Sequence, residues 1–221
     1  MTRLIIVTAV TLGCGAFSLV SIGQVRSSTQ NPVDRVQPFD RLAGPRIEVP
    51  EGPTGVAALR QFCPERTDTC RNYWAYTIHF VQNYTIPLRD KELLILRTAW
   101  LSRGDYVWGR HNVMGQNAGL TPGEIQRIAE GPDASGWSDF DAVLLRAADE
   151  LHTSRFVSEA TWHALADEYT QDQLVEVVLI IGNYTQLTMF QNTLGVQLPP
   201  DIEGLPEDPE SVPLSPVPGA R

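Results

Sequence analysis

The sequence predicts an all-α protein. Apolar residues recur at helical spacing in successive segments, and no stretch of any length alternates as a strand would. Two capping boxes, Thr121 with Glu124 and Thr170 with Gln173, mark the starts of helices. Gly195 marks the end of the last helix. We therefore expect a helical bundle.

Each expected helix carries its own signal, either a cap or an apolar stripe. The segment 88–118 is expected to form two helices joined near residues 103–104. Residues 174–181 are apolar on nearly all sides, which is typical of a helix buried in a bundle or between subunits. The other expected helices cover residues 55–62, 72–84, 121–130, 138–152, 158–169 and 170–194.

Length and composition favour one domain, which we expect at residues 54–198. The chain has 221 residues, 43% of them hydrophobic, enough for one sizeable core. A net charge of −9 and a pI near 4.9 argue against a nucleic-acid partner. The sequence has no Gly-rich phosphate loop and no Cys/His cluster with zinc spacing.

The N-terminal segment predicts export. A positively charged start precedes a mostly apolar run over residues 4–22, and Ser21-Ile22-Gly23 fits a small-x-small cleavage site. We expect residues 1–23 to be a signal peptide, with an uncleaved membrane anchor as the alternative. The mature protein would then be periplasmic or secreted, or membrane-anchored if the segment stays uncleaved.

Two segments outside the domain are expected to be irregular. Residues 24–53 are polar and carry several prolines, which indicates a linker or an arm over the surface. Residues 199–221 contain seven prolines and form a Pro-rich tail.

Cys63 and Cys70 form an even pair in a chain expected to be exported. Such a pair predicts a local structural disulfide. A redox-active pair is the alternative, but this spacing lacks the Cys-x-x-Cys geometry that lowers the pKa of a thiol.

Glu92 and His111 are the candidate acid–base pair. Glu92 lies within an apolar helical stripe, where an ionised carboxylate is costly without a partner. An antiparallel helix pair would bring His111 to it in a largely dry pocket. The structural alternative is that Glu92 only complements the dipole of its helix and that His111 is a core histidine.

Glu92 and His111 belong to a set of residues that recur at fixed intervals in one known family. They are Glu92, Tyr106-x-Trp108-x-x-His111, Ala118-Gly119-Leu120-Thr121 and Glu124-Ile125. Over residues 87–197 this pattern resembles the carboxymuconolactone decarboxylase family of the alkylhydroperoxidase-like superfamily. The resemblance implies the helical bundle of that superfamily and a homo-oligomer, commonly a trimer or hexamer.

The resemblance also bears on thiol chemistry. In the peroxidase branch of the superfamily, a Cys-x-x-Cys precedes the histidine by seven and four residues. Those positions are Gly104 and Val107 here, and neither residue supplies a thiolate. The decarboxylase branch also lacks the pair. Many similar sequences carry Glu at the position of Val107.

The first hypothesis is therefore a cofactor-free enzyme acting on a small carboxylic acid or lactone, as in decarboxylation. His111 would be the general acid and base, and Glu92 would orient it. Four further residues are candidates for the substrate pocket: Tyr106 and Trp108 as lining residues, and Arg97 and Arg110 as partners for a substrate carboxylate.

Other functions stay open. A non-catalytic ligand-binding or structural oligomer is the second hypothesis. Peroxide reduction requires Cys63 and Cys70 to fold over the His111 pocket. No metal site is expected, although His79, Glu92 and His111 would supply a two-His-one-carboxylate set if their helices converged.

Overall fold

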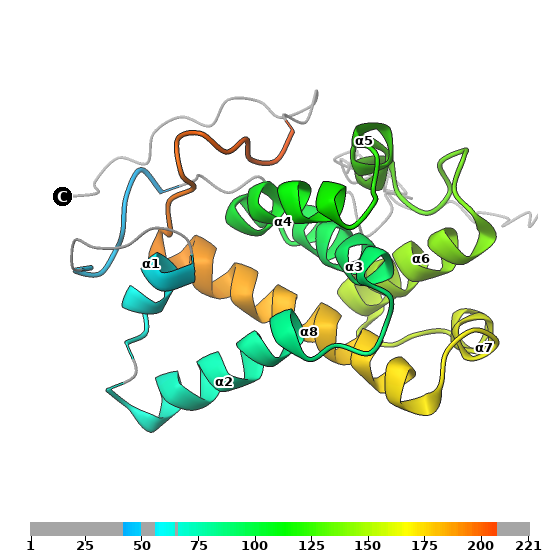
Figure 1. Ribbon diagram of the computed structural model, residues 1–221, viewed down its shortest axis with the longest axis horizontal. Coiled ribbons are helices and arrows are strands. Elements are labelled where there is room, and N and C mark those ends of the chain that lie inside the picture. Colours follow the sequence, from blue (N-terminus) through cyan, green and yellow to red (C-terminus); the bar gives the residue numbers. More distant parts are fainter. Residues whose placement is uncertain (1–41, 50–55, 65, 207–221) are drawn as a thin grey trace, which may run out of the picture. The chain divides into compact units, whose positions relative to one another are not determined.

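The computed structural model describes residues 42–49, 56–64 and 66–206, and these residues form helices without any strand (Figure 1). This confirms the all-α prediction. The helices are α1 (Val56–Gln61), α2 (Asp68–Gln82), α3 (Leu88–Leu101), α4 (Asp105–Asn117), α5 (Pro122–Glu130), α6 (Asp139–Ser154), α7 (Glu159–Ala166) and α8 (Gln171–Leu194).

The predicted helix ends follow from local chemistry. The Thr121 hydroxyl accepts a hydrogen bond from the Glu124 backbone amide, and the Glu124 carboxylate accepts one from the Thr121 backbone amide. Thr170 and Gln173 form the same capping box at the start of α8. Gly195 ends α8 at φ 75°, in the left-handed region that glycine adopts without strain.

Helix α3 is the centre of the bundle. It contacts α4, α5, α6 and α8 (Figure 1). Residues 93–96 of this helix are fully buried. A helix apolar on several sides requires neighbours on each of them. Any charged side chain on α3 must therefore find a partner inside the protein.

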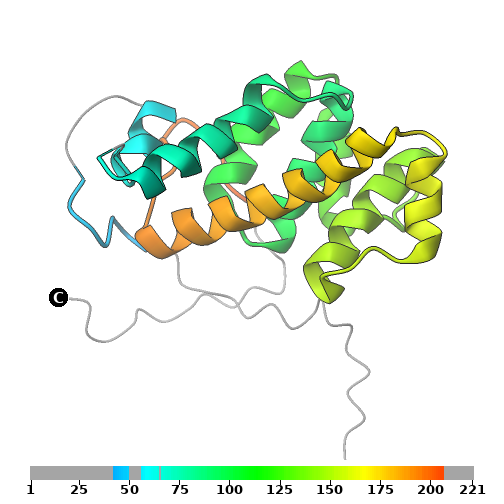
Figure 2. The same cartoon turned by 90° about the horizontal axis from the view of Figure 1, so that it is seen from below.

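Helices α2 and α8 lie side by side and run antiparallel (Figure 2). Trp74 in the middle of α2 packs edge-on against Phe190 near the end of α8, and Thr77 donates to Asn183 about one turn further along α2. This packing covers one face of α8. Elsewhere along α8 four large apolar side chains are exposed to solvent: Val175, Val178, Leu179 and Met189.

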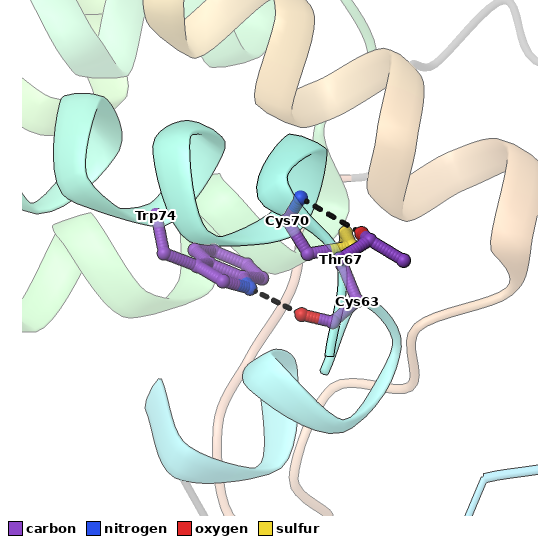
Figure 3. Close-up of a disulfide and its surroundings, with 4 residues drawn as sticks. All are labelled: Cys63, Thr67, Cys70 and Trp74. Carbon is purple, nitrogen blue, oxygen red and sulfur yellow. Dashed lines mark hydrogen bonds between the residues drawn. A yellow bond between two sulfur atoms is a disulfide. The ribbon is translucent and has the colours of Figure 1, made fainter. Parts of the chain in front are cut away.

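The disulfide between Cys63 and Cys70 joins the start of α2 to the turn after α1 (Figure 3). Thr67 caps α2 by accepting from the Cys70 amide, and the Trp74 indole donates to the Cys63 carbonyl at 2.6 Å. The predicted disulfide is present, and these contacts attach both of its cysteines to the start of the helical domain.

Both irregular segments contact the helical domain where they are described. The Arg46 amide donates to the Leu194 carbonyl, and the Gln197 side chain donates to the Leu42 carbonyl. Residues 199–206 of the tail contain no helix, yet the Leu205 amide donates to Asp105 on α4.

The segment expected to be a signal peptide or anchor, residues 1–23, lies outside the described residues. No helix in the described part of the chain is long and apolar enough to cross a membrane.

Candidate active site

The turn between α3 and α4 sets the geometry of the candidate site. Arg103 adopts a positive φ of 57°, and the Gly104 amide donates to the Ala99 carbonyl, so that α4 packs back along α3. At Gly115 an added Cβ would lie 3.2 Å from Leu96, so glycine allows the two helices to approach closely beside Glu92.

Glu92 and His111 are in direct contact, as the spacing of the two helices predicted. Glu92 Oε2 lies 2.7 Å from His111 Nδ1, with Glu92 fully buried and His111 7% exposed. A neutral imidazole that donates from Nδ1 to the carboxylate keeps its lone pair on Nε2. No described residue hydrogen-bonds Nε2. The ring is therefore oriented to exchange a proton through Nε2.

Tyr184 of α8 forms the next wall of the site. Its ring packs edge-on against His111, with the ring centroids 5.0 Å apart. Burial, together with the nearby charge of Glu92, raises the pKa of Tyr184 far above that of an exposed tyrosine. Tyr184 therefore stays a neutral phenol. Among the described residues its hydroxyl has no hydrogen-bond partner.

Lys91 is a site residue that the sequence reasoning missed. Its Nζ lies 3.7 Å from Glu92 Oε1, on the side of the carboxylate away from the imidazole contact. Nζ also donates to the Phe80 carbonyl at 3.4 Å and lies 3.7 Å from the centroid of the Tyr84 ring. Burial lowers the pKa of Lys91, while Glu92 and Glu176 act to raise it.

Arg97 does not remain available for a substrate. Its guanidinium forms two hydrogen bonds to Asp149, at 2.6 and 2.9 Å, and also donates to the Ile128 and Ala129 carbonyls. Only 5% of its side chain is exposed. This bidentate pair fastens α3 to α6 and to the end of α5. We therefore remove Arg97 from the candidate substrate-binding residues.

The other predicted pocket residues lie on α4. Trp108 is buried and packs against Trp100, with the ring centroids 5.9 Å apart, which makes it a core residue. Tyr106 is buried and lines a small cavity together with Gln191 and Leu198. Arg110 is half-buried and acts to lower the pKa of Tyr106, although burial raises that pKa more. No described contact joins these residues to the Glu92–His111 pair.

The possible metal set is not assembled. His79 is exposed on α2, where its ring packs against Phe80. No group of three or more His, Cys, Asp or Glu side chains suited to hold a metal ion occurs among the described residues.

Glu176 on α8 is a second buried carboxylate, and its role is structural. It accepts hydrogen bonds from the backbone amide and the hydroxyl of Thr85. These contacts fasten the segment between α2 and α3 to the start of α8.

The disulfide lies away from the pair. It is attached to the start of α2, whose Trp74 contacts Phe190 late in α8, whereas His111 contacts Tyr184 earlier in α8. No described contact joins Cys63 or Cys70 to His111. The arrangement gives no support to a thiol closing over the imidazole.

Comparison with known proteins supports the fold. No family model and no curated protein matches the sequence. The structure is similar to a protein of unknown function from Agrobacterium tumefaciens, named as a candidate antioxidant defence protein AhpD, at 14% identity and a TM-score of 0.57. That match covers 64% of this chain and 95% of the other.

A second similar structure is the alkylhydroperoxidase AhpD core of an uncharacterized peroxidase-related protein from Ralstonia eutropha. It is 16% identical with a TM-score of 0.57, and the match covers 66% of this chain and 76% of that one. At such identities the likeness concerns the backbone. The chain therefore has the AhpD-like helical fold.

Proposed function

We propose that the protein is a cofactor-free acid–base enzyme of the carboxymuconolactone decarboxylase type, acting on a small carboxylic acid or lactone. The observation that carries this proposal is the buried Glu92–His111 contact, which leaves Nε2 of an oriented imidazole without a protein partner. A positioned imidazole is the commonest general acid and base in enzymes.

The chemistry requires one proton at the carbon that loses CO₂. Loss of CO₂ from an activated carboxylate breaks the bond to the carboxylate carbon, and the electron pair passes into a conjugated carbonyl as an enolate. The neutral His111 ring would take up one proton from solvent at Nε2, and the imidazolium so formed would deliver this proton to the enolate carbon. Glu92 would stabilise the imidazolium that precedes this step and fix the ring through Nδ1.

Tyr184 and Arg110 are the side chains we propose for the substrate. The neutral Tyr184 hydroxyl is suited to donate a hydrogen bond to a carbonyl or carboxylate oxygen. Arg110, which no described residue engages in an ion pair, is suited to hold a second carboxylate.

We also propose that the protein is exported and self-associates as a trimer or hexamer. The apolar run before a small-x-small site supports export. The exposed apolar side chains near the start of α8, Val175, Val178 and Leu179, support association, because neighbouring apolar side chains in water favour a protein partner.

A non-catalytic binding oligomer is the second candidate. Its support is the closure of the site, since Glu92 is fully buried and His111 nearly so. The support for peroxide reduction as the function is weaker. Although the neighbours are named for it, Gly104 and Val107 occupy the two thiol positions here.

The test is turnover of a panel of lactones and carboxylic acids, measured by CO₂ release and by proton NMR of the products. We expect one substrate class to be turned over, and His111→Gln or Glu92→Gln to lower kcat by about 100-fold or more. His163→Gln is the matched control, because His163 is an exposed histidine on α7. If the wild-type protein binds a ligand of the panel but turns none of them over, the second candidate, a binding oligomer, is favoured.

A further inference from the structure

The chain has a single lysine, and this lysine is buried. Lys91 is the only lysine among 221 residues, and every other basic side chain counted with it is an arginine. Its exposed fraction is 1%. Lysine is among the residues least often buried, since its amine must be paired when it leaves water.

The contacts of Lys91 lead directly to the candidate site. The two oxygens of Glu92 are divided between two neighbours: Oε2 contacts His111 Nδ1 at 2.7 Å, and Oε1 faces Lys91 Nζ at 3.7 Å. Oε1 is fully buried and has no hydrogen-bond partner in the described part of the chain. Lys91 is thus the cation that faces this oxygen.

We infer that Lys91 is a positioning residue that keeps Glu92 ionised and His111 neutral. The inference rests on the proposed function, because it deepens the role of the same pair. Without a cation, a buried carboxylate beside an imidazole would draw a proton onto the imidazole. With Lys91 present, the charge of Glu92 is already balanced, so the neutral ring keeps its lone pair on Nε2.

The side chains around Lys91, Glu92 and His111 agree with this role for Lys91. From α8, Glu176 faces Lys91 and Tyr184 faces Glu92 and His111. Glu176 is already held by Thr85, and Tyr184 remains a neutral phenol. In the segment after α2, the face of the Tyr84 ring lies over the Lys91 amine. The negative potential of this face stabilises the cation.

This balance also bears on the substrate class. An unbalanced Glu92 would repel any anion that approached His111. Because Lys91 compensates that charge, a substrate carboxylate can approach the ring. The unit of Lys91, Glu92 and His111 has no net charge in this state and therefore does not repel an anionic substrate.

The first experiment follows the His111 ring by NMR as pH is varied, using Lys91→Met, which keeps the volume but removes the charge. We expect the titration midpoint of His111 to rise by about one pH unit or more. Lys91→Arg should stay close to wild type, because it restores the charge. Arg89→Gln is the control, since it removes a cation two residues away whose partners are Glu124 and Asp141.

A second experiment avoids any variant at Lys91 itself. Because the chain has one lysine, ¹³Cε labelling of lysine gives one signal, and its titration can be followed directly. Neutralising Glu92 in Glu92→Gln should lower the midpoint of Lys91 by about one pH unit or more, since Glu92 stabilises the charged amine.

The outcomes separate the inference from the proposed function. If Glu92→Gln moves His111 but not Lys91, or if Lys91→Met leaves His111 in place, the role of Lys91 is overturned and the pair survives. If Glu92→Gln moves Lys91 but not His111, the proposed pair fails instead.

Discussion

Thr188 of α8 occupies the space that a side chain at Gly104 would need. A Cβ added at Gly104 would lie 2.6 Å from Thr188 Oγ1 and 3.0 Å from its methyl carbon. The resemblance to the alkylhydroperoxidase-like superfamily implies that Gly104 stands at the first thiol position of its peroxidase branch. The protein therefore lacks both the thiol and the room for it.

The first prediction concerns this space. Gly104→Cys should lower the free energy of unfolding by about 1–3 kcal/mol, the usual cost of overpacking. Adding Thr188→Ala should recover most of the loss, because Thr188 Oγ1 is buried without a hydrogen-bond partner and is cheap to remove. Urea unfolding measures both changes. Equal stability of Gly104→Cys and wild type would show that Thr188 moves freely.

The second prediction concerns Arg97. Arg97→Met should lower the free energy of unfolding by about 3 kcal/mol or more, since it leaves Asp149 and the carbonyls of Ile128 and Ala129 without their donor. The control is Arg146→Met, whose exposed pair with Asp133 should contribute less than about 1 kcal/mol. A stable Arg97→Met chain with weakened binding of carboxylates would return Arg97 to the substrate site.

The third prediction concerns the disulfide. Replacing Cys63 and Cys70 by serine should lower the free energy of unfolding by about 2–3 kcal/mol, from the entropy of closing a short loop. Thermal unfolding followed by circular dichroism measures the loss. The His111 titration should stay unchanged, because no described contact joins it to the disulfide. A changed titration would mean that the two are coupled.

The fourth prediction concerns alkaline pH. Burial raises the pKa of Tyr73 to about 12. Between about pH 10 and 12, the unfolded chain loses this proton while the folded chain keeps it, so stability falls as pH rises. The slope is about 1.4 kcal/mol per pH unit for each such tyrosine.

Tyr73→Phe should therefore make the alkaline loss of stability shallower by one proton. Urea unfolding at several pH values from 9 to about 11.5 measures the slope. Burial also raises the pKa of Tyr169 and Tyr184, so some loss should persist in the variant. An unchanged slope would mean that Tyr73 ionises equally in both states.

Much of the fold was predictable because its signals are local. The capping boxes at Thr121 and Thr170 each lie within four residues, and the bridge between Cys63 and Cys70 closes a short loop. The contact of Glu92 with His111 was also predictable, because a short turn joins their helices.

The roles of Arg97 and Lys91 depend on residues far away in the chain. Arg97 is paired with Asp149, 52 residues further on, and its own helix gives no sign of this partner. Lys91 follows the charged run Arg89-Asp90, which reads as a solvated surface. It is buried because the Phe80 carbonyl and the Tyr84 ring, from another segment, cover its amine.

The central claim is that Glu92 and His111 act as one buried, charge-coupled pair, and the most direct test is an NMR titration of the four histidines in wild type and Glu92→Gln. The signal of His111 is assigned by its loss in His111→Gln. We predict that neutralising Glu92 lowers the titration midpoint of this histidine by about one pH unit or more, which is about 1.4 kcal/mol of coupling. A midpoint that stays in place would contradict the pair.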